Sequence, residues 1–427
     1  MSVLSPSPPL RELTSRQIQW IGAGYVMTFS SMAGQTIFIA QFNTALRQAF
    51  DLSNGQFGLL YTAGTLVSSI VLIWAGALAD RIAPRTLALA CMAGLAAVSL
   101  GMSLVGNIVV LGLLLFGLRF FGQGMMVHIA MTTMSRWFNR FRGRALAIAQ
   151  FGFPTAEASL PFVVTLAIAA YGWRQVWIAV VAVIVLALMP LVTLLLHSAP
   201  DGRRAQARGL TNPDGETAAG PIGTQWTRGA VLKDPLFWAL IPGFMGPPAI
   251  VTLFMFHQAN LAALKGWDLT LFTAFFPFLS LTAVLTSIVS GVMVDRFGAW
   301  RIVPFVLIPL SIGSLIIGFL DPLWVVPAFF ICVGMTGGMM SPVVGALWAE
   351  LYGTAHIGAI RALTTSALVL ASAIGPGLAG TLIDAGMPLD RQAFFYAAFC
   401  ALAVIGYLML APALGRRVAA LQAASEK

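Results

Sequence analysis

The sequence predicts an all-α membrane protein whose twelve transmembrane helices form two pseudo-symmetric six-helix bundles, with both termini cytoplasmic. Three observations lead to this fold class. Hydrophobic residues make up 59% of the 427 residues and charged residues only 9%, whereas a soluble domain carries about 25% charged residues. Long apolar segments recur along the whole chain, with arginines concentrated in alternate connections. Short motifs of the first half also return in the second half.

Twelve apolar segments approach the length of about 20 residues that a helix needs to cross a bilayer. We place them at 19–43, 56–79, 86–106, 108–134, 145–170, 174–197, 235–262, 270–293, 302–320, 323–348, 359–386 and 393–413. Segments this long and continuously apolar predict helices, because lipid offers backbone polar groups no partners. The first segment is too long for a signal peptide and is expected to be retained.

The arginine-bearing connections all fall on one side of the membrane if the chain crosses it twelve times. They hold Arg11, Arg16, Arg81, Arg85, Arg136, Arg140, Arg142, Arg144, Arg203, Arg204, Arg208, Arg228, Arg296, Arg301, Arg416 and Arg417. The other side has only scattered charges such as Arg47, Lys265 and Arg391. Positive loops remain cytoplasmic, so both termini are predicted to be cytoplasmic. The net charge of +9 thus fits membrane topology better than nucleic-acid binding.

A polar stretch rich in glycine, proline and charge, residues 198–233, separates two six-helix halves and is interpreted as a cytoplasmic linker. The predicted organisation is a cytoplasmic N-terminal tail, a first bundle, this linker, a second bundle and a cytoplasmic C-terminal tail. Their boundaries are 1–17, 18–197, 198–233, 234–414 and 415–427.

The two halves repeat one another. "GALADR" at 76–81 corresponds to "GVMVDR" at 291–296, an offset of 215 residues. "GMM" at 124 recurs at 338, and "RAL" at 144 recurs at 361. "QFN" and "DLS", at 41 and 51, parallel "QAN" and "DLT", at 258 and 268. Five matches in order at nearly constant offset indicate duplicated units related by an axis along the membrane normal.

The stretch "GALADRIAPR" (76–85) resembles the signature that the major facilitator superfamily places between its second and third helices, G-x-x-x-D-R-x-G-x-R. "RFFGQG" (119–124) resembles that family's fourth-helix pattern, R-x-x-x-G-x-G. The resemblance implies a secondary transporter in which the signature latches the cytoplasmic side when the protein opens outward. The matching residues are Gly76, Asp80, Arg81 and Arg85, and in the second copy Gly291, Asp295 and Arg296.

Four other stretches resemble a branch of that family, the oxalate–formate exchangers and monocarboxylate transporters. They are 136–149, 171–173, 232–240 and 350–363. This finer resemblance implies a small organic anion as cargo.

Two charges lie at matching depth inside consecutive apolar segments. Arg119 is about 16 Å into segment 108–134 and Glu157 about 18 Å into segment 145–170, at a rise of about 1.5 Å per residue. Both are therefore near the middle of a hydrocarbon core about 30 Å thick. We expect Arg119 to face a central cavity, to attract an anionic cargo group or to pair with Glu157, which as a desolvated carboxyl could carry a proton. A pair that only fixes helix packing is the alternative.

Other polar residues are weaker candidates for binding or coupling: Gln35, Ser31, Tyr25, His128 and His257. For each of them, packing or interhelical hydrogen bonding is the alternative. Four polar residues repeat symmetrically at the outer ends of the first and seventh segments, which favours a structural or gating role. They are Gln41, Asn43, Gln258 and Asn260.

Several chemistries have no motif in this sequence. There is no phosphate-binding loop, no zinc-protease or serine-hydrolase motif and no histidine spacing for a metal. Three cysteines lie in apolar segments and are expected to be buried thiols. We therefore expect neither enzyme activity nor a cofactor or metal. The expected partners are a small-molecule substrate and membrane lipid, with no nucleic acid, and the protein is expected to be monomeric.

The sequence thus predicts a transporter of the plasma membrane, or of the inner membrane in a bacterium. Its leading cargo is a monocarboxylate-like anion, moved with protons or by exchange. A proton-coupled exporter of drug-like or amphipathic compounds is the first alternative, because aromatic and methionine residues suit an apolar cavity. A non-transporting membrane sensor or assembly partner is the second, although the intact signature in both halves disfavours it.

Overall fold

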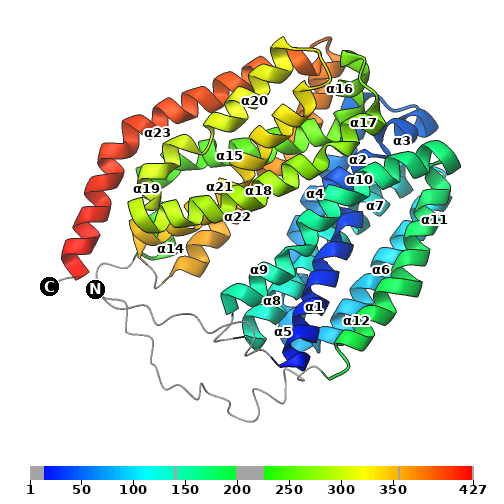
Figure 1. Cartoon of the computed structure of the whole chain (residues 1–427), viewed down its shortest axis with the longest axis horizontal. Coiled ribbons are helices and arrows are strands. Elements are labelled where there is room, and N and C mark those ends of the chain that lie inside the picture. Colours follow the sequence, from blue (N-terminus) through cyan, green and yellow to red (C-terminus); the bar gives the residue numbers. More distant parts are fainter. Residues whose placement is uncertain (1–13, 139–141, 199–225, 354–355, 426–427) are drawn as a thin grey trace. The chain divides into compact units, whose positions relative to one another are not determined.

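The computed structural model describes residues 14–138, 142–198, 226–353 and 356–425, and within these ranges all regular structure is helical (Figure 1). Most of the linker 198–233 and the first 13 residues of the predicted N-terminal tail lie outside the described residues. Packing divides the chain into two compact units. The first contains residues 1–45 and 63–211, and the second contains 46–62 and 212–427.

The first unit begins with an interrupted helix: α1 (Ser15–Ser30), a 3-10 turn η2 (Ser31–Gly34) and α2 (Thr36–Ala40). Thr14 starts α1 with a capping box in which it and Gln17 satisfy one another's backbone N–H groups. Two helices follow that are shared with the second unit, α3 (Asn43–Phe50) and α4 (Asn54–Ala75). The further helices are α5 (Leu78–Arg81), α6 (Pro84–Leu104), α7 (Ile108–Gly117), the π-helix η3 (Leu118–Met126), α8 (Val127–Trp137), α9 (Arg142–Gln150), α10 (Gly152–Tyr171), α11 (Trp173–Val183), the π-helix η4 (Ile184–Leu188) and α12 (Met189–Leu195).

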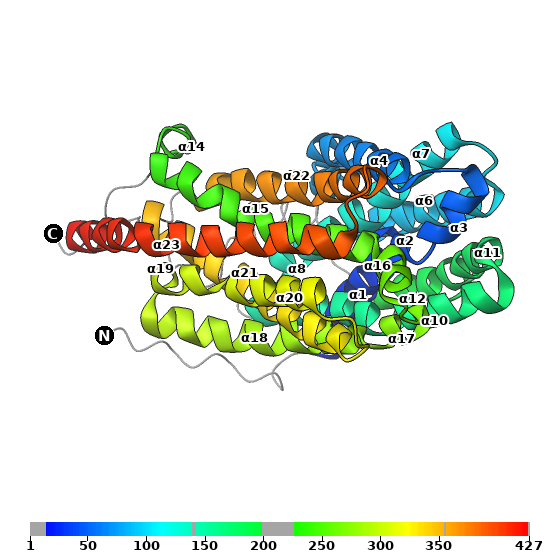
Figure 2. The ribbon, with the colours of Figure 1, turned by 90° about the horizontal axis from the view of Figure 1, so that it is seen from above.

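The second unit is built mainly from long uninterrupted helices. Its elements are α14 (Arg228–Val231), α15 (Pro235–Phe256), α16 (Gln258–Lys265), α17 (Leu269–Ala274), α18 (Phe276–Phe297), α19 (Ala299–Ile302), the 3-10 turn η5 (Val303–Phe305), α20 (Ile308–Phe319), α21 (Val325–Tyr352), α22 (Ile357–Asp384) and α23 (Leu389–Ser425). Asp234 caps α15, and Pro235 in its first turn has no N–H to leave unpaired. Within this unit α18 packs on α21, α15 on α22 and α20 beside α23 (Figure 2).

Eleven helices in the described ranges are long and apolar enough to cross a membrane. Many of their large apolar side chains are exposed, as expected for surfaces in contact with lipid. The predicted segment 19–43 is not among the eleven, because its helix is interrupted near Gln35. The fold class is therefore confirmed as an all-helical, multi-pass membrane protein, and the predicted first segment forms a helix broken in two.

One short stretch crosses the division between the units. Residues 46–62, the end of α3 and the first part of α4, precede most of the first unit in sequence but group with the second. Within that unit the Asp384 carboxylate accepts hydrogen bonds from the backbone N–H groups of Asn54 and Gly55, at 3.1 and 2.7 Å. Thr62 donates a further bond to the carbonyl of Ala373 at 2.7 Å. The start of α4 is thus anchored on α22.

Candidate transport site

The break in the first helix is produced by close contact between two backbones. Gln35 is extended, with φ −82° and ψ 151°, and separates η2 from α2. A Cβ atom on Gly34 would lie 2.8 Å from the Cα of Gly122 and would collide with the carbonyl oxygen of Leu118. A Cβ on Gly122 would likewise lie 2.7 Å from the Cα of Gly34. Glycine on both sides therefore lets the broken helix touch η3 directly.

Arg119 lies on η3 and binds both sides of this break. Its Nη1 donates to the carbonyl of Gly34 at 3.1 Å and to the hydroxyl of Thr36 at 3.3 Å. Its Nε donates to the hydroxyl of Thr65 on α4 at 3.1 Å. The side chain is only 1% exposed. The guanidinium is thus engaged by helices of its own unit, and contact with cargo stays a prediction.

The carboxylate predicted with Arg119 is buried on a neighbouring helix. Glu157 is 6% exposed on α10, which contacts both η2 and α2. The helix break is therefore contacted by the two elements that carry the buried charges. Hydropathy alone does not predict the helix break or its contacts. The matching depths of Arg119 and Glu157 in the sequence did indicate that the two charges lie near one another.

Ser31 and Gln35 are also at the break. Ser31 donates its hydroxyl to the carbonyl of Thr28 at 2.6 Å and accepts from the amide of Gln35 at 3.5 Å. Tyr25 is half-buried on α1, farther from the break, with its ring stacked on Phe29 at 6.5 Å. Ser31 and Gln35 are therefore part of the helix break, whereas Tyr25 lies outside it on α1.

The first copy of the family signature is held by two residues of α8. A ring nitrogen of His128 lies 3.1 Å from the carbonyl oxygen of Gly76. Arg136 donates to the carbonyl of Ala79 at 2.8 Å. Arg81 is exposed at the end of α5, Arg85 is half-buried at the start of α6, and the side chain of Asp80 lies outside the described part of the chain. His128 is thus placed with the signature, a position that its sequence spacing did not indicate.

The turn that follows the second copy of the signature is held by a carboxylate that the sequence analysis did not single out. Glu350 on α21 accepts hydrogen bonds from the backbone N–H groups of Ala299 and Trp300, at 2.7 and 3.1 Å. Gly298 makes the turn possible with φ +83°. The guanidinium of Arg296 lies 5.3 Å from the ring centre of Phe297. In the sequence Glu350 is marked only by opening the stretch 350–363 and by lying three residues before Gly353.

The repeated polar residues behave differently in the two copies. Gln41 is buried and makes two hydrogen bonds, to the carbonyl of Ile37 and from the hydroxyl of Thr165, both at 2.8 Å. Gln258 is fully buried, yet neither polar atom of its amide has a partner in the described structure. Asn43 is buried at the start of α3 and Asn260 is half-buried on α16. The two glutamines are therefore repeated in sequence but not in hydrogen bonding.

His257 is buried directly after α15. One ring nitrogen lies 2.9 Å from the carbonyl oxygen of Pro376, within the second unit. The other, Nδ1, has no partner among the atoms described. The Pro376 carbonyl is close to Gly58 on α4 as well, since a Cβ there would lie 2.5 Å from it. His257 thus stands where α15, α22 and the start of α4 meet.

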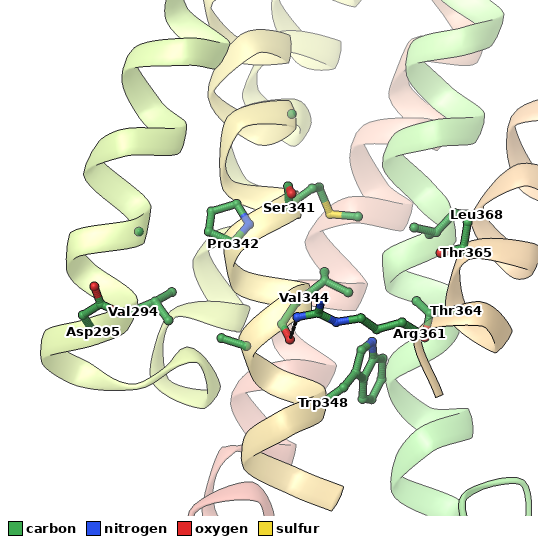
Figure 3. Close-up of a pocket in the computed structure, with 15 residues that line it drawn as sticks. Val294, Asp295, Ser341, Pro342, Val344, Trp348, Arg361, Thr364, Thr365 and Leu368 are labelled. Atoms are coloured by element: carbon green, nitrogen blue, oxygen red, sulfur yellow. Dashed lines mark hydrogen bonds between the residues drawn. The ribbon is translucent and has the colours of Figure 1, made fainter. Parts of the chain in front are cut away.

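A cavity of about 720 Å³ lies inside the second unit, between α18, α21 and α22 (Figure 3). Gly291 and Asp295 of the second signature line its wall on α18, and Arg361 lines it from α22. In the sequence Arg361 stands out only as the first residue of the repeated "RAL" and as part of stretch 350–363, and neither feature indicated a cavity.

Comparison with known proteins agrees with this architecture. The profile of the Major Facilitator Superfamily matches residues 24–376 and, in a second match, 266–424. The search of curated proteins found no relative of similar sequence.

Two solved structures are similar over nearly the whole chain. A bacterial homolog of the human lysosomal transporter Spinster, inward-facing and unoccupied, has a TM-score of 0.68 at 14% identity, covering 97% of this chain and 98% of its own. The nucleoside transporter NupG has a TM-score of 0.69 at 11% identity, covering 93% and 99%. At these identities the likeness concerns the fold alone, but the family profile covers most of the sequence. The chain belongs to the major facilitator superfamily.

Proposed function

We propose that this protein is a secondary-active transporter that moves a small organic anion by alternating access, coupled to protons or by exchange. The family and the fold support the transporter class. The charge of the cargo rests on one observation: a buried arginine bound to both sides of a broken membrane helix.

This arginine is a feature of one repeat only. At the local offset, Arg119 corresponds to Val333 on α21, so the duplicated fold does not need a charge there. A charge at membrane depth is costly and is usually retained for function. Transporters commonly build their sites where a membrane helix is interrupted, because the break leaves backbone polar groups for cargo and ions. We infer that opening the break would redirect Arg119 from Gly34 to an anionic group.

Glu157 is the proposed proton carrier. It is buried on α10 beside the same break. A carboxyl that loses its proton only in one conformation couples the proton gradient to cargo movement. Neutral glutamine at this position would keep the size and abolish the coupling.

A second candidate function has an observation in its favour. Because Gly34, Thr36 and Thr65 already engage the guanidinium, Arg119 would also suit a purely positioning role in an exporter of amphipathic compounds. The two structural neighbours carry the names of different kinds of transporter, so the fold does not choose between these cargoes.

Uptake into proteoliposomes tests the proposal. With protein reconstituted in liposomes, an imposed inward proton gradient should drive accumulation of radiolabelled lactate, and Glu157→Gln should remove the response to the gradient. Arg119→Gln should reduce uptake itself, and Arg174→Gln is its matched control, because Arg174 also donates to backbone carbonyls of the first unit, those of Ser103 and Val105. Efflux of a fluorescent cationic dye without carboxylate transport would replace the proposal with the second candidate.

A further inference from the structure

The cavity of the second unit combines a charged donor with an unused neutral one. Its wall is formed by α18, α21 and α22, toward the ends of these helices that adjoin the second signature (Figure 3). Its volume of about 720 Å³ would admit a small organic molecule. The question is which chemistry its polar groups would recognise.

Arg361 supplies the positive charge. Its side chain is exposed and crosses from α22 toward α21 (Figure 3). Nη2 donates one hydrogen bond, to the carbonyl of Gly345 at 2.8 Å. A guanidinium has five N–H donors in a planar fork, so most of this fork is left for a ligand in the described structure. Asp295, the acidic residue of the cavity wall, forms no ion pair with it among the residues described.

Trp348 supplies the second donor. Its side chain is fully buried, it lines the cavity, and its indole Nε1–H has no hydrogen-bond partner among the described atoms. Figure 3 shows this nitrogen turned toward the side chain of Arg361. A buried donor without an acceptor is unfavourable, so a ligand oxygen placed there would be stabilised.

The rest of the wall favours one charge and an apolar body. Met340, Val344 and Leu368 contribute apolar surface, and Ser341 and Thr365 contribute hydroxyl groups. Asp295 lies across the cavity from Arg361 (Figure 3) and would repel a second negative charge. These features disfavour a dicarboxylate.

We propose that this cavity binds a monocarboxylate, whose oxygens accept hydrogen bonds from the Arg361 guanidinium and the Trp348 indole N–H while its apolar body lies against α21 and α22. The inference rests on the proposed function, to which it adds a docking site in the second repeat. Binding in this cavity can be measured without transport, and it does not depend on Arg119.

Calorimetric titration of the full-length protein in detergent with sodium benzoate tests the site. Benzoate should bind, whereas benzamide, which has the same shape without the charge, should not. Arg361→Gln should weaken binding by about tenfold or more, and Trp348→Phe, which keeps the ring and removes the donor, by about threefold to tenfold. Arg361→Lys should fall between the wild type and Arg361→Gln, because it keeps the charge and loses the fork.

The control is Arg301→Gln. Arg301 is also exposed, also donates to one backbone carbonyl, that of Phe297, and does not line the cavity. Benzoate affinity should be unchanged in this variant. Wild-type affinity in Arg361→Gln, or equal binding of benzamide, would overturn the proposed site.

The site and the proposed function fail in different ways. Should Arg361→Gln not fold, the Arg361→Lys variant and the benzamide comparison decide the question of the site. Benzoate binding that depends on Arg361, in a protein that moves no carboxylate in liposomes, would overturn the proposed function alone. Lactate uptake with benzoate affinity unaffected by Arg361 would overturn the site alone.

Discussion

The helix that carries Arg119 and its counterpart in the second repeat have the same place in the duplication but different backbones. Residues 108–137 form an α-helix, a nine-residue π-helix and a second α-helix, whereas 325–352 form one continuous α-helix. The same contrast separates the broken first crossing from α15, which is uninterrupted even though it contains Pro242, Pro247 and Pro248. In both of these comparisons the irregular backbone is in the first repeat, next to Arg119.

The break near Gln35 is caused by contacts with other helices and not by the local sequence. Prolines inside α15 do not interrupt it, and no proline is near Gln35. What holds the interrupted backbone is the contact between Gly34 and Gly122 together with the hydrogen bonds from Arg119. π-helical turns are frequent at functional sites. This agrees with a functional site in the first repeat, while the corresponding helix of the second repeat is regular.

The largest expected effect comes from removing the charge at the break. Arg119→Gln leaves three acceptors partly unsatisfied, so it should lower the free energy of unfolding by about 2–4 kcal/mol and reduce uptake by about a hundredfold. Val333→Ala at the corresponding position should lower stability by about 2 kcal/mol through lost packing and leave the affinity for cargo unchanged. Denaturant titration and uptake kinetics measure both. Equal transport defects in the two variants would contradict a special role for the first repeat.

A smaller effect on stability alone is expected from the glycine contact. Gly34→Ala would push a methyl group into the backbone of η3 and should cost about 3 kcal/mol. Gly406→Ala in α23 is the control, because its Cβ would meet no atom within 4 Å, and it should be neutral or stabilising by up to about 1 kcal/mol. Thermal unfolding followed by circular dichroism compares them. A normal melting temperature for Gly34→Ala would show that the two backbones do not touch.

The tethers of the two signature copies should differ in strength. Glu350→Gln weakens two charge-assisted bonds and should cost about 1–2 kcal/mol, whereas Arg136→Gln, which removes a bond to Ala79, should cost about 1 kcal/mol. Proteolysis at the two loops, read by mass spectrometry, would show which signature is loosened. Equal protease cleavage at both loops in either variant would show that Glu350 and Arg136 do not each hold one signature copy.

The smallest effects distinguish the two repeated glutamines. Gln41→Met should cost about 1 kcal/mol, because two hydrogen bonds are lost. Gln258→Met should be neutral or slightly stabilising, because its buried amide has no described partner to lose. The melting temperatures of Gln41→Met and Gln258→Met, each compared with the wild type, measure the two effects. A large loss for Gln258→Met would indicate a polar contact that the described residues do not contain.

The fold could be predicted almost entirely from the sequence, and the site only in outline. Segment length and hydropathy are local properties, and they sufficed for the eleven long apolar helices that the structure describes. Arg119 and Glu157 could be singled out because charges inside apolar segments are conspicuous, whereas the predicted exposure of Arg119 to a central cavity stays a prediction. The break at Gln35, the tethers from His128 and Glu350, and the cavity beside Arg361 depend on which helices touch. A single sequence does not contain that information.

The anchoring of the first part of α4 on α22 has a consequence for how the polypeptide can be divided. A cut between the two halves of the sequence would leave residues 46–62 on one fragment and their packing partners on the other. The C-terminal fragment alone would then expose Phe256, whose ring centre lies 5.2 Å from that of Phe57 and 4.6 Å from that of Tyr61. We therefore expect the fragments to accumulate only when they are co-expressed, because each covers apolar surface that the other would otherwise expose.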